Sequence, residues 1–420
     1  MGKISGTWQN FYMQTSNKGD LKDWRTLATG GFLKYQYRLK NFEFAGALHT
    51  SLNTGIQDLT IADAQTGKLS RYEEGLYDRL DLDDPLVLIL GELYASYSNN
   101  GHNIRLGRMK FASPMLNGQD GRMIPTLFQG FHYAYKKERT QVQAAIFNAV
   151  APRSTGGFFQ IGESIGTYPV GRDNSGQEAQ YAGYIDSDFL LVANFNQNIN
   201  RNLKIEIWDY YIENVSNSVY IRPSIKLNEK FGLHTEFMHQ DRLNNGGNAV
   251  DSLSFFQDAS SNLFGLKLLY KIEKKSSVSL AYNRILPEGK FLFPREWGRE
   301  FLFSFQKRER SEGSADNHAL VAYYDRDFSL FNRNLSVHSI FSAGHHWKPS
   351  VLDPVDNKYA MPDYTQLNLD LFFSFPNLKR LKMELLLVNK ISSGDIPDNP
   401  NFYFNKADMF QVNFIMNYSF

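Results

Sequence analysis

The sequence contains no cysteine, almost no net charge and no long apolar run. The absence of cysteine from its 420 residues excludes a disulfide framework, zinc–thiolate sites, iron–sulfur clusters and cysteine nucleophiles. The 45 Lys and Arg residues are balanced by 44 Asp and Glu, so no surplus of cations is present to bind nucleic acid. The longest apolar runs, residues 85–90 and 385–388, fall far short of the roughly 20 residues that a membrane-spanning helix requires.

Aromatic residues are abundant, at 15% of the chain, although the mean hydropathy is only −0.41. Their spacing accounts for this combination, because apolar residues occupy every second position in many segments. Residues 33–39, 131–135, 264–270 and 367–373 show this pattern. The clearest case is the C-terminal segment, whose apolar positions are Phe410, Val412, Phe414, Met416, Tyr418 and Phe420. A period of two predicts strands with one apolar face and argues against helices.

The segments between these strands are of two kinds that largely alternate. Eight are short turns, such as residues 40–41 and 99–101, and the others are mostly long, such as residues 56–83, 151–183 and 287–317. Short periplasmic turns and long extracellular loops are typical of transmembrane β-barrels. In such a barrel lipid replaces the protein core, so only alternate residues of each strand need be apolar, and aromatic side chains collect at the two membrane interfaces.

We therefore predict an all-β fold, a single transmembrane antiparallel β-barrel domain of 18 strands over residues 1–420. The even number of strands places both termini on the periplasmic side. A soluble β-sandwich is the alternative, but it would have to bury two interiors and would leave the alternation of loop lengths unexplained. The predicted strands cover residues 4–13, 25–39, 42–55, 84–98, 102–110, 127–136, 139–149, 184–195, 203–213, 219–227, 231–242, 262–272, 278–286, 318–328, 335–346, 364–375, 381–391 and 408–420.

Residues 106–130 read LGRMKFASPMLNGQDGRMIPTLFQG, which resembles the pattern LGR…P…D-x-R…P…F-x-G of the OprD porin family. Residues 324–328 (YDRDF), followed by residues 335–337 (LSV), are similar to a late region of that family. The resemblance implies an outer-membrane porin whose third loop, about residues 111–126, and long seventh loop, about residues 287–317, fold inward and narrow the pore. It also implies a line of basic side chains that guides small nutrients bearing a carboxylate.

Strand alternation assigns several charged side chains to the lumen, where they avoid the cost of roughly 2–4 kcal/mol that Lys or Arg meets on the lipid face at the bilayer midplane. The predicted basic ladder consists of Lys34, Arg105, Arg222 and Lys267. The predicted lumen acids are Glu92, Glu236 and Asp370. Such a mixed lining suits zwitterions, with the carboxylate on the cations and the ammonium on the acids. The alternative is that any wide barrel lines its lumen with polar groups, some of them cationic.

The prolines and glycines of the third loop predict a rigid constriction that carries Asp120 and Arg122. Arg108, at the junction of strand and loop, is assigned to the same constriction. For each of these residues the alternative is a structural role, anchoring the loop to the barrel wall. Phe420, together with Tyr418 two positions earlier, resembles the C-terminal signal that the outer-membrane assembly machinery recognises.

We expect a substrate-selective diffusion channel of the bacterial outer membrane, for small solutes that carry a carboxylate or are zwitterionic, such as amino acids. Its expected partners are the solute, the lipid bilayer and the assembly machinery, with no nucleic acid, and its expected state is a monomer or a homotrimer. The nine scattered His residues and the absence of a catalytic motif predict neither an enzyme, nor a cofactor, nor a metal site.

The first residues lack the apolar core of a secretory signal, so we expect any export signal to have been removed. No plug domain precedes Ile4, which favours passive diffusion over energised import. The alternative function is that of a structural or receptor barrel, a plugged component of a larger outer-membrane complex.

Overall fold

The computed structural model describes residues 2–118, 122–331 and 334–420, and one antiparallel sheet with its connections accounts for the architecture. The sheet contains 18 long strands. They are β1 (Gly2–Asn17), β2 (Trp24–Leu39), β3 (Phe42–Asn53), β4 (Leu86–Asn99), β5 (His102–Met109), β6 (Leu127–Lys137), β7 (Thr140–Ala151), β9 (Leu190–Asn198), β10 (Leu203–Ile212), β11 (Ser216–Lys226), β12 (Phe231–Arg242), β13 (Ser260–Glu273), β14 (Ser276–Ile285), β15 (Asn317–Leu330), β16 (Leu335–Trp347), β17 (Asp363–Ser374), β18 (Leu381–Ser393) and β19 (Met409–Ser419). The two-residue β8 (Phe159–Gln160) pairs only with the end of β7.

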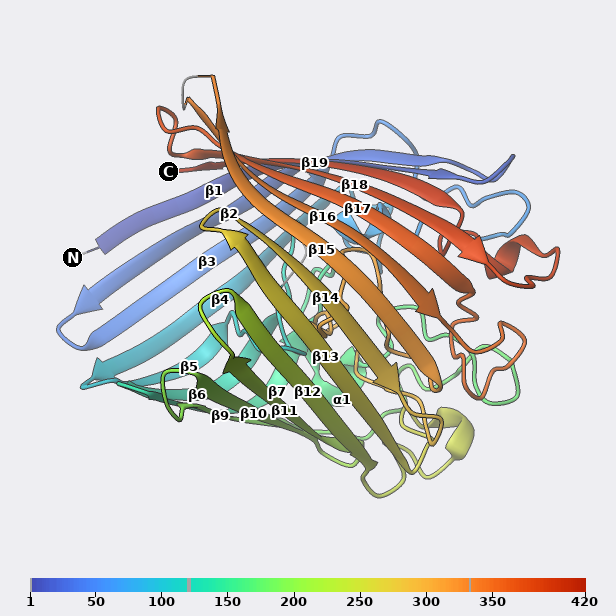
Figure 1. Ribbon diagram of the computed structural model, residues 1–420, viewed down its shortest axis with the longest axis horizontal. Helices are drawn as coiled ribbons and strands as arrows, with labels where there is room; N and C mark the ends of the chain where they lie inside the picture. The colour runs from blue at the N-terminus through green and yellow to red at the C-terminus, as the bar shows by residue number, and fades with distance from the viewer. Residues whose placement is uncertain (1, 119–121, 332–333) are drawn as a thin grey trace.

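The sheet closes into a barrel because β1 is paired on both sides. Thr7 lies opposite Phe32 of β2 and opposite Ser419 of β19. Gly6 and Phe420 complete this seam by exchanging backbone hydrogen bonds of 3.1 and 3.0 Å. Figure 1 shows both chain ends at the same end of the barrel. The prediction of a closed antiparallel barrel of 18 strands is confirmed.

Short turns join the strands at the end of the barrel where the termini lie, and loops join them at the other end (Figure 1). Between β4 and β5 the turn is the two-residue Asn100-Gly101, whose φ angles of 47° and 86° both lie in the left-handed region that a tight hairpin turn requires. We number the connections at the other end in chain order. They are L1 (18–23), L2 (54–85), L3 (110–126), L4 (152–189), L5 (213–215), L6 (243–259), L7 (286–316), L8 (348–362) and L9 (394–408).

The strands turn their apolar faces outward and their polar faces into the lumen. In β19, Phe410 is 44% exposed, whereas Gln411 and Asn413 are fully buried inside the barrel. Leu88 and Leu106 lie on the outer surface in the same way, at 60% and 61% exposure. A soluble protein would bury the apolar face, so the exposed apolar surface identifies the barrel as a transmembrane one.

The predicted strand boundaries are close to those observed, with one clear exception. The strand expected at residues 184–195 begins at Leu190, because the preceding residues belong to L4. The carbonyl of Ser187 accepts a hydrogen bond of 2.9 Å from Gly162 of the short helix α1 (Ile161–Ser164) rather than from a neighbouring strand. Three short 3₁₀ segments lie in L2, L6 and L9, at Glu74–Leu76, Asp251–Leu253 and Pro400–Phe402. In the part of the chain that the structure describes, no helix is long and apolar enough to cross a membrane.

Candidate functional site

Loop L7 crosses the interior of the barrel. Its residues 303–308 contact the inward faces of seven strands, so the loop is held from one side of the lumen to the other. The contacts are Phe303 N to Glu236 of β12 (2.8 Å), Ser304 N to Asn283 of β14 (2.7 Å), the carbonyls of Phe303 and Phe305 to the hydroxyl of Tyr323 of β15 (3.1 and 2.8 Å), Gln306 to Ser342 of β16 (2.8 Å), Lys307 to Asp370 of β17 (2.5 Å) and Glu384 of β18 (2.7 Å), and Arg308 to Asn413 of β19 (2.6 Å).

Loop L3 is fixed to L7 mainly through one buried amide side chain. The Nδ2 of Asn117 donates to the carbonyl of Arg299 at 2.9 Å, and its Oδ1 accepts from the N–H of the same residue at 3.1 Å. The backbone N–H of Asn117 also donates to the carbonyl of Trp297 at 3.2 Å. Further along L3, the hydroxyl of Thr126 donates to the carbonyl of Glu296 at 3.1 Å. The two loops therefore form one connected layer.

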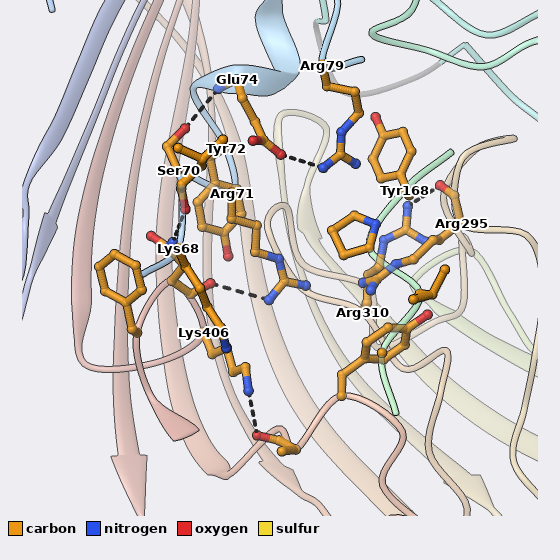
Figure 2. A pocket seen from close by; sticks show the side chains of 18 of the residues that line it. Lys68, Ser70, Arg71, Tyr72, Glu74, Arg79, Tyr168, Arg295, Arg310 and Lys406 are labelled. Atoms are coloured by element: carbon orange, nitrogen blue, oxygen red, sulfur yellow. Dashed lines mark hydrogen bonds and ion pairs between the residues drawn. The ribbon is translucent and has the colours of Figure 1, made fainter. Parts of the chain in front are cut away.

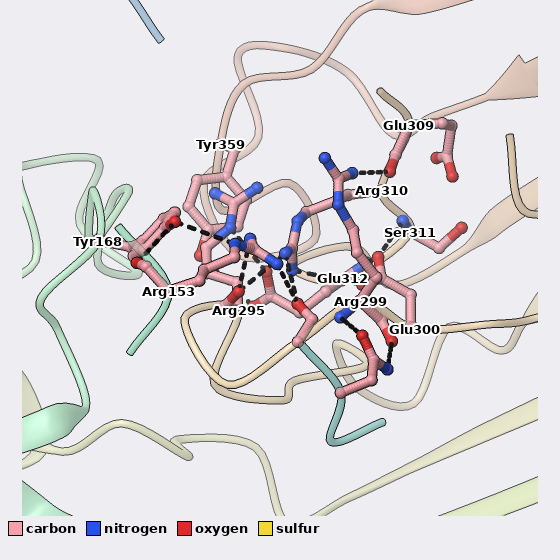
Figure 3. Close-up of polar contacts among 12 residues, drawn as sticks. Arg153, Tyr168, Arg295, Arg299, Glu300, Glu309, Arg310, Ser311, Glu312 and Tyr359 are labelled. Carbon is pink, nitrogen blue, oxygen red and sulfur yellow. Dashed lines mark hydrogen bonds and ion pairs between the residues drawn. The ribbon is translucent and has the colours of Figure 1, made fainter. Parts of the chain in front are cut away.

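Loop L4 joins this layer through Arg153, which is 2% exposed. Its guanidinium donates to the carbonyls of Gly298 and Arg295 at 2.8 and 2.9 Å, and to the hydroxyl of Tyr168 at 2.9 Å. Figure 3 shows Arg153 and Tyr168 meeting the arginines of L7 in this layer. Because a planar guanidinium offers five donors, one side chain here links two backbone segments and a phenol.

A cavity of about 580 Å³ lies among L2, L3, L4, L7, L8 and L9. Among the residues that the structure describes, its lining contains twelve cationic side chains and two carboxylates, those of Glu74 and Glu178. Aromatic side chains line it as well, among them Tyr72, Tyr168 and Tyr359. The cations are Lys68, Arg71, Arg79, Arg122, Arg153, Arg172, Arg295, Arg299, Arg308, Arg310, Lys358 and Lys406. Since the whole chain carries a formal charge of only +1, the fold has concentrated positive charge at this place.

Some of the lining cations are paired with carboxylates of L7. Arg310 lies 3.3 Å from Glu300, and Arg295 lies 3.5 Å from Glu312. The guanidinium of Arg295 also stacks 4.0 Å from the centre of the Tyr359 ring. We call Arg153, Arg295, Arg299 and Arg310 the central arginine group; Figure 3 shows them close together, with their polar contacts.

The other side of the cavity carries cations from L2, L4 and L9. We call Lys68, Arg71, Arg172 and Lys406 the four-cation group. Figure 2 shows Arg71 and Lys406 on one side of the cavity, with Arg295, Arg310 and Tyr168 on the other. The cavity therefore presents positive charge to a solute from two sides.

The protonation of two side chains in the cavity changes near pH 8. Burial raises the pKa of Tyr168, but Arg153 and two further arginines outweigh this effect and lower the pKa to about 8. Arg79 is one of them, and its guanidinium lies 4.2 Å from the centre of the Tyr168 ring. Burial lowers the pKa of Lys358 to about 8 against the opposing attraction of Glu312. The positive charge of the cavity therefore decreases as the pH rises through about 8.

The four cations of the predicted ladder all lie on inward strand faces, but they form two pairs rather than one line. Lys34 and Arg105 lie 5.0 and 4.4 Å from the centre of the same ring, Tyr94. Arg222 lies 5.3 Å from the ring of Phe303 in L7, and Lys267 lies 5.1 Å from the ring of Tyr323. All four are closer to the short-turn end of their strands than to the loop end. They are thus separate from the cavity.

The three predicted lumen acids are engaged by the protein itself. Glu92 is paired with Lys34 at 2.6 Å. Glu236 accepts hydrogen bonds from Tyr220, from Asn283 and from the backbone of L7. Asp370 is paired with Lys307 of L7. Two of the three acids therefore hold L7 in place.

The residues assigned to the constriction lie in different environments. Arg122 lines the cavity, and its Nη1 donates to the carbonyl of Tyr72 in L2 at 2.7 Å. Gly75 of L2 packs against the Arg122 guanidinium so closely that any side chain there would collide with it. Arg108 is a correction, because it shares the outward face of β5 with Leu106 and stacks 4.4 Å from the ring of Phe158. Asp120 lies outside the described residues.

The predicted assembly residues lie at the seam of the barrel. Tyr418 faces outward opposite Trp8, and the two rings are 43% and 54% exposed. Phe420 is 50% exposed and pairs with Gly6 through its backbone. Both aromatic side chains thus lie on the outer surface near the short-turn end, where a membrane interface would meet the barrel.

Sequence reasoning missed most of the cavity. Arg122 is the only described residue among the predicted site residues that lines it. The remaining cations are spread over five loops with no common spacing, so no sequence motif contains them. The one local signal is the run Lys307-Arg308-Glu309-Arg310 in L7, two of whose members, Arg308 and Arg310, line the cavity.

Comparison with known proteins shows which solved structures share the fold. No protein-family model and no curated protein sequence matches the chain. Among solved structures, OpdO of Pseudomonas aeruginosa matches 100% of this chain and 97% of its own at 16% identity, with a TM-score of 0.70. OccAB4 of Acinetobacter baumannii matches 100% of this chain and 98% of its own at 15% identity, with a TM-score of 0.73. The outer membrane protein OpdK of P. aeruginosa, in a structure with vanillate, matches 100% of this chain and 98% of its own at 14% identity, with a TM-score of 0.72.

These solved proteins are barrels of the outer membrane, and the match extends over the whole of the present chain. The chain has the OprD-type porin fold, as the resemblance of residues 106–130 predicted.

Proposed function

We propose that this protein is a solute-selective diffusion channel of the bacterial outer membrane, and that its solutes are small anions bearing carboxylate or similar groups. The observation that carries the proposal is the cavity of about 580 Å³, whose described lining has twelve cations and two carboxylates in a chain of nearly zero net charge. Charged side chains close to a narrow path select ions by sign, because the low dielectric of the wall strengthens their field.

In this proposal the solute passes three regions of the channel. A solute enters from the loop end and binds in the cavity. It then passes the layer of L3 and L7, which narrows the lumen as the resemblance implies. Below this layer it meets Arg222 and Lys267 on one part of the wall and Lys34 and Arg105 on another. The contact of Arg222 with the ring of Phe303 in L7 supports this order, since it lies directly against the narrowing loop.

Anions fit this lumen better than zwitterions do. A zwitterion needs a free carboxylate for its ammonium group, and the three predicted lumen acids are already engaged by Lys34, by Lys307 and by the hydrogen bonds around Glu236. Placing a second cation beside an acid that already has a partner gains little. The cations of the cavity, in contrast, outnumber their acidic neighbours.

One observation favours the second candidate, a structural or receptor barrel of a larger complex. L7 is bound to seven strands across the lumen, and a layer held in this way would also block the lumen as a plug. The barrel would then use its long loops to bind a partner and would pass no solute.

Single-channel recording in planar bilayers tests the proposal with the purified full-length chain. We expect discrete conductance steps and a reversal potential in a salt gradient that shows a preference for anions. Arg172→Glu, in the cavity, should shift the reversal potential towards cations, whereas Arg380→Glu, an equal change of charge in the exposed turn between β17 and β18, should shift it little. A barrel that inserts but carries no current would favour the structural role instead, and a preference for cations would contradict the anion selectivity.

A further inference from the structure

The four-cation group differs from the rest of the cavity lining in its lack of acidic partners. Within the described residues, Lys68, Arg71, Arg172 and Lys406 have no carboxylate within 4 Å, although they line one side of a single cavity. Arg79, on the same loop as Arg71, is by contrast paired with Glu74 at 2.5 Å. The positive charge of this group is therefore uncompensated at short range.

The hydrogen bonds of the group position the cations without neutralising them. Arg71 donates to the carbonyl of Asn405 at 3.3 Å, and Arg172 donates to the carbonyl of Asn357 at 2.7 Å. Lys406 donates to one carbonyl of L9 and one of L8, at 2.9 and 3.2 Å. The Nε of Arg172 is buried and has no hydrogen-bond partner. A set of cations that the backbone holds in place, and that retains an unused donor, is prepared for an external anion.

The repulsion among the four cations affects the pKa of Lys406. Burial lowers the pKa of its ammonium group well below the usual value, and repulsion from Lys68, Arg71 and Arg172 lowers it further. A protein gains nothing from such a cluster in the empty state. An anion that enters the cavity removes this repulsion, and more negative charge removes more of it.

The four-cation group shows how much negative charge the cavity can accept. In the part of the chain that the structure describes, its four positive charges have no carboxylate within 4 Å. A solute with a single negative charge leaves most of this positive charge in place.

We propose that the cavity selects a small polyanion, a solute with two or more carboxylate, phosphate or sulfate groups. This inference rests on the proposed channel function and names the solute class of the same site. One anionic group of the solute binds the four-cation group, and another binds the central arginine group on the opposite side (Figure 2). The rings of Tyr72, Tyr359, Phe402 and Phe404, in the same lining, provide surface for the carbon skeleton between them.

A series of carboxylates that differ in charge but little in size tests the selection. Butyrate, succinate and tricarballylate are added in turn to the full-length channel in a planar bilayer at low ionic strength, and the dissociation constant of each is obtained from the interruptions of the current. We expect affinity to increase by about tenfold for each added carboxylate, because each one adds attraction to the cations of the cavity. Equal affinities for the three acids would overturn the inference.

A matched pair of variants locates the effect. Arg71→Gln combined with Lys406→Gln removes two charges from the four-cation group and should lower the ratio of tricarballylate to butyrate affinity by about tenfold or more. Lys379→Gln combined with Arg380→Gln removes the same two types of charge from the exposed turn between β17 and β18 and should leave the ratio unchanged. An equal decrease of the ratio of tricarballylate to butyrate affinity in both variants would show that the cavity does not select the solute.

The wild-type chain alone provides a further test if the cavity variant does not assemble. The affinity for tricarballylate should fall more steeply with increasing salt than the affinity for butyrate, since more ion pairs are screened. Equal salt dependence for the two acids would refute the inference.

The experiments distinguish a failure of the polyanion site from a failure of the channel function. A channel that conducts anions but does not distinguish butyrate from tricarballylate retains the proposed function and loses the polyanion site. A barrel without current loses the channel function, and calorimetric titration of the detergent-solubilised chain with the same three acids then decides whether the cavity binds polyanions.

Discussion

At the scale of single residues, the cavity shows how environment sets the charge of a side chain. Tyr168 is a phenol surrounded by arginines, and Lys358 is a buried ammonium, yet both have a pKa of about 8. Deprotonation of either group makes the charge of the cavity less positive. As the pH rises through 8, the phenol gains a negative charge and the ammonium loses a positive one. Both changes reduce the attraction for an anion.

We therefore expect anion preference to fall between about pH 7 and pH 9, as measured by the reversal potential in a fixed salt gradient. Tyr168→Phe and Lys358→Met should each remove part of this pH dependence, and the double variant should remove most of it. Tyr184→Phe, at an exposed phenol of L4, is the control and should leave the profile unchanged. A wild-type reversal potential that stays constant over this range would show that neither group senses the pH of the path.

At the scale of elements, the loops rather than the strands determine the narrow part of the barrel. L7 depends on the strands for its position through Glu236, Asp370 and Glu384, and L3 depends on L7 through Asn117. Each strand supplies only a few contacts, but the contacts come from seven strands. The layer of L3 and L7 is consequently fixed to the barrel wall at many points.

Asn117 offers a direct test of this layer. Asn117→Ala removes the side-chain hydrogen bonds of Asn117 to Arg299 and leaves buried backbone groups of L7 without partners, at a cost of roughly 1–3 kcal/mol. We expect larger fluctuations of the open-channel current and a higher conductance, with the barrel itself intact on gel electrophoresis of unheated samples. Asn117→Asp retains the acceptor for the N–H of Arg299 and should show a smaller effect. Unchanged current in the alanine variant would mean that L3 does not narrow the path.

At the scale of the whole molecule, the sequence predicts the barrel far better than the cavity. The period of two in segments such as residues 367–373 reports which side of the wall a residue faces, and this local rule held for Lys34, Arg105, Arg222 and Lys267. The assignment of Arg108 to the constriction was wrong, because the same rule turns this side chain outward together with Leu106. The cavity could not be predicted, because its cations come from six loops that are far apart in the sequence and are brought together by the barrel.

Closure itself depends on the two ends of the chain. Phe420 exchanges two backbone hydrogen bonds with Gly6, and its ring packs so closely against Gly6 that a side chain at that position would collide with it. Deleting Phe420 removes both bonds and one of the aromatic groups of the seam, where an unpaired strand edge in lipid is costly. We expect slower insertion into vesicles and a lower folded fraction, measured by the shift in electrophoretic mobility on heating.

Phe420→Tyr is the control, because it keeps the backbone bonds and an aromatic ring and should insert at the wild-type rate. Phe420→Asp keeps the backbone but places a charge at the outer surface, so its defect separates the contribution of the ring from that of the hydrogen bonds. Insertion of the deletion variant into pure lipid at the wild-type rate, together with poor assembly in cells, would assign the residue to recognition by the assembly machinery rather than to closure of the barrel.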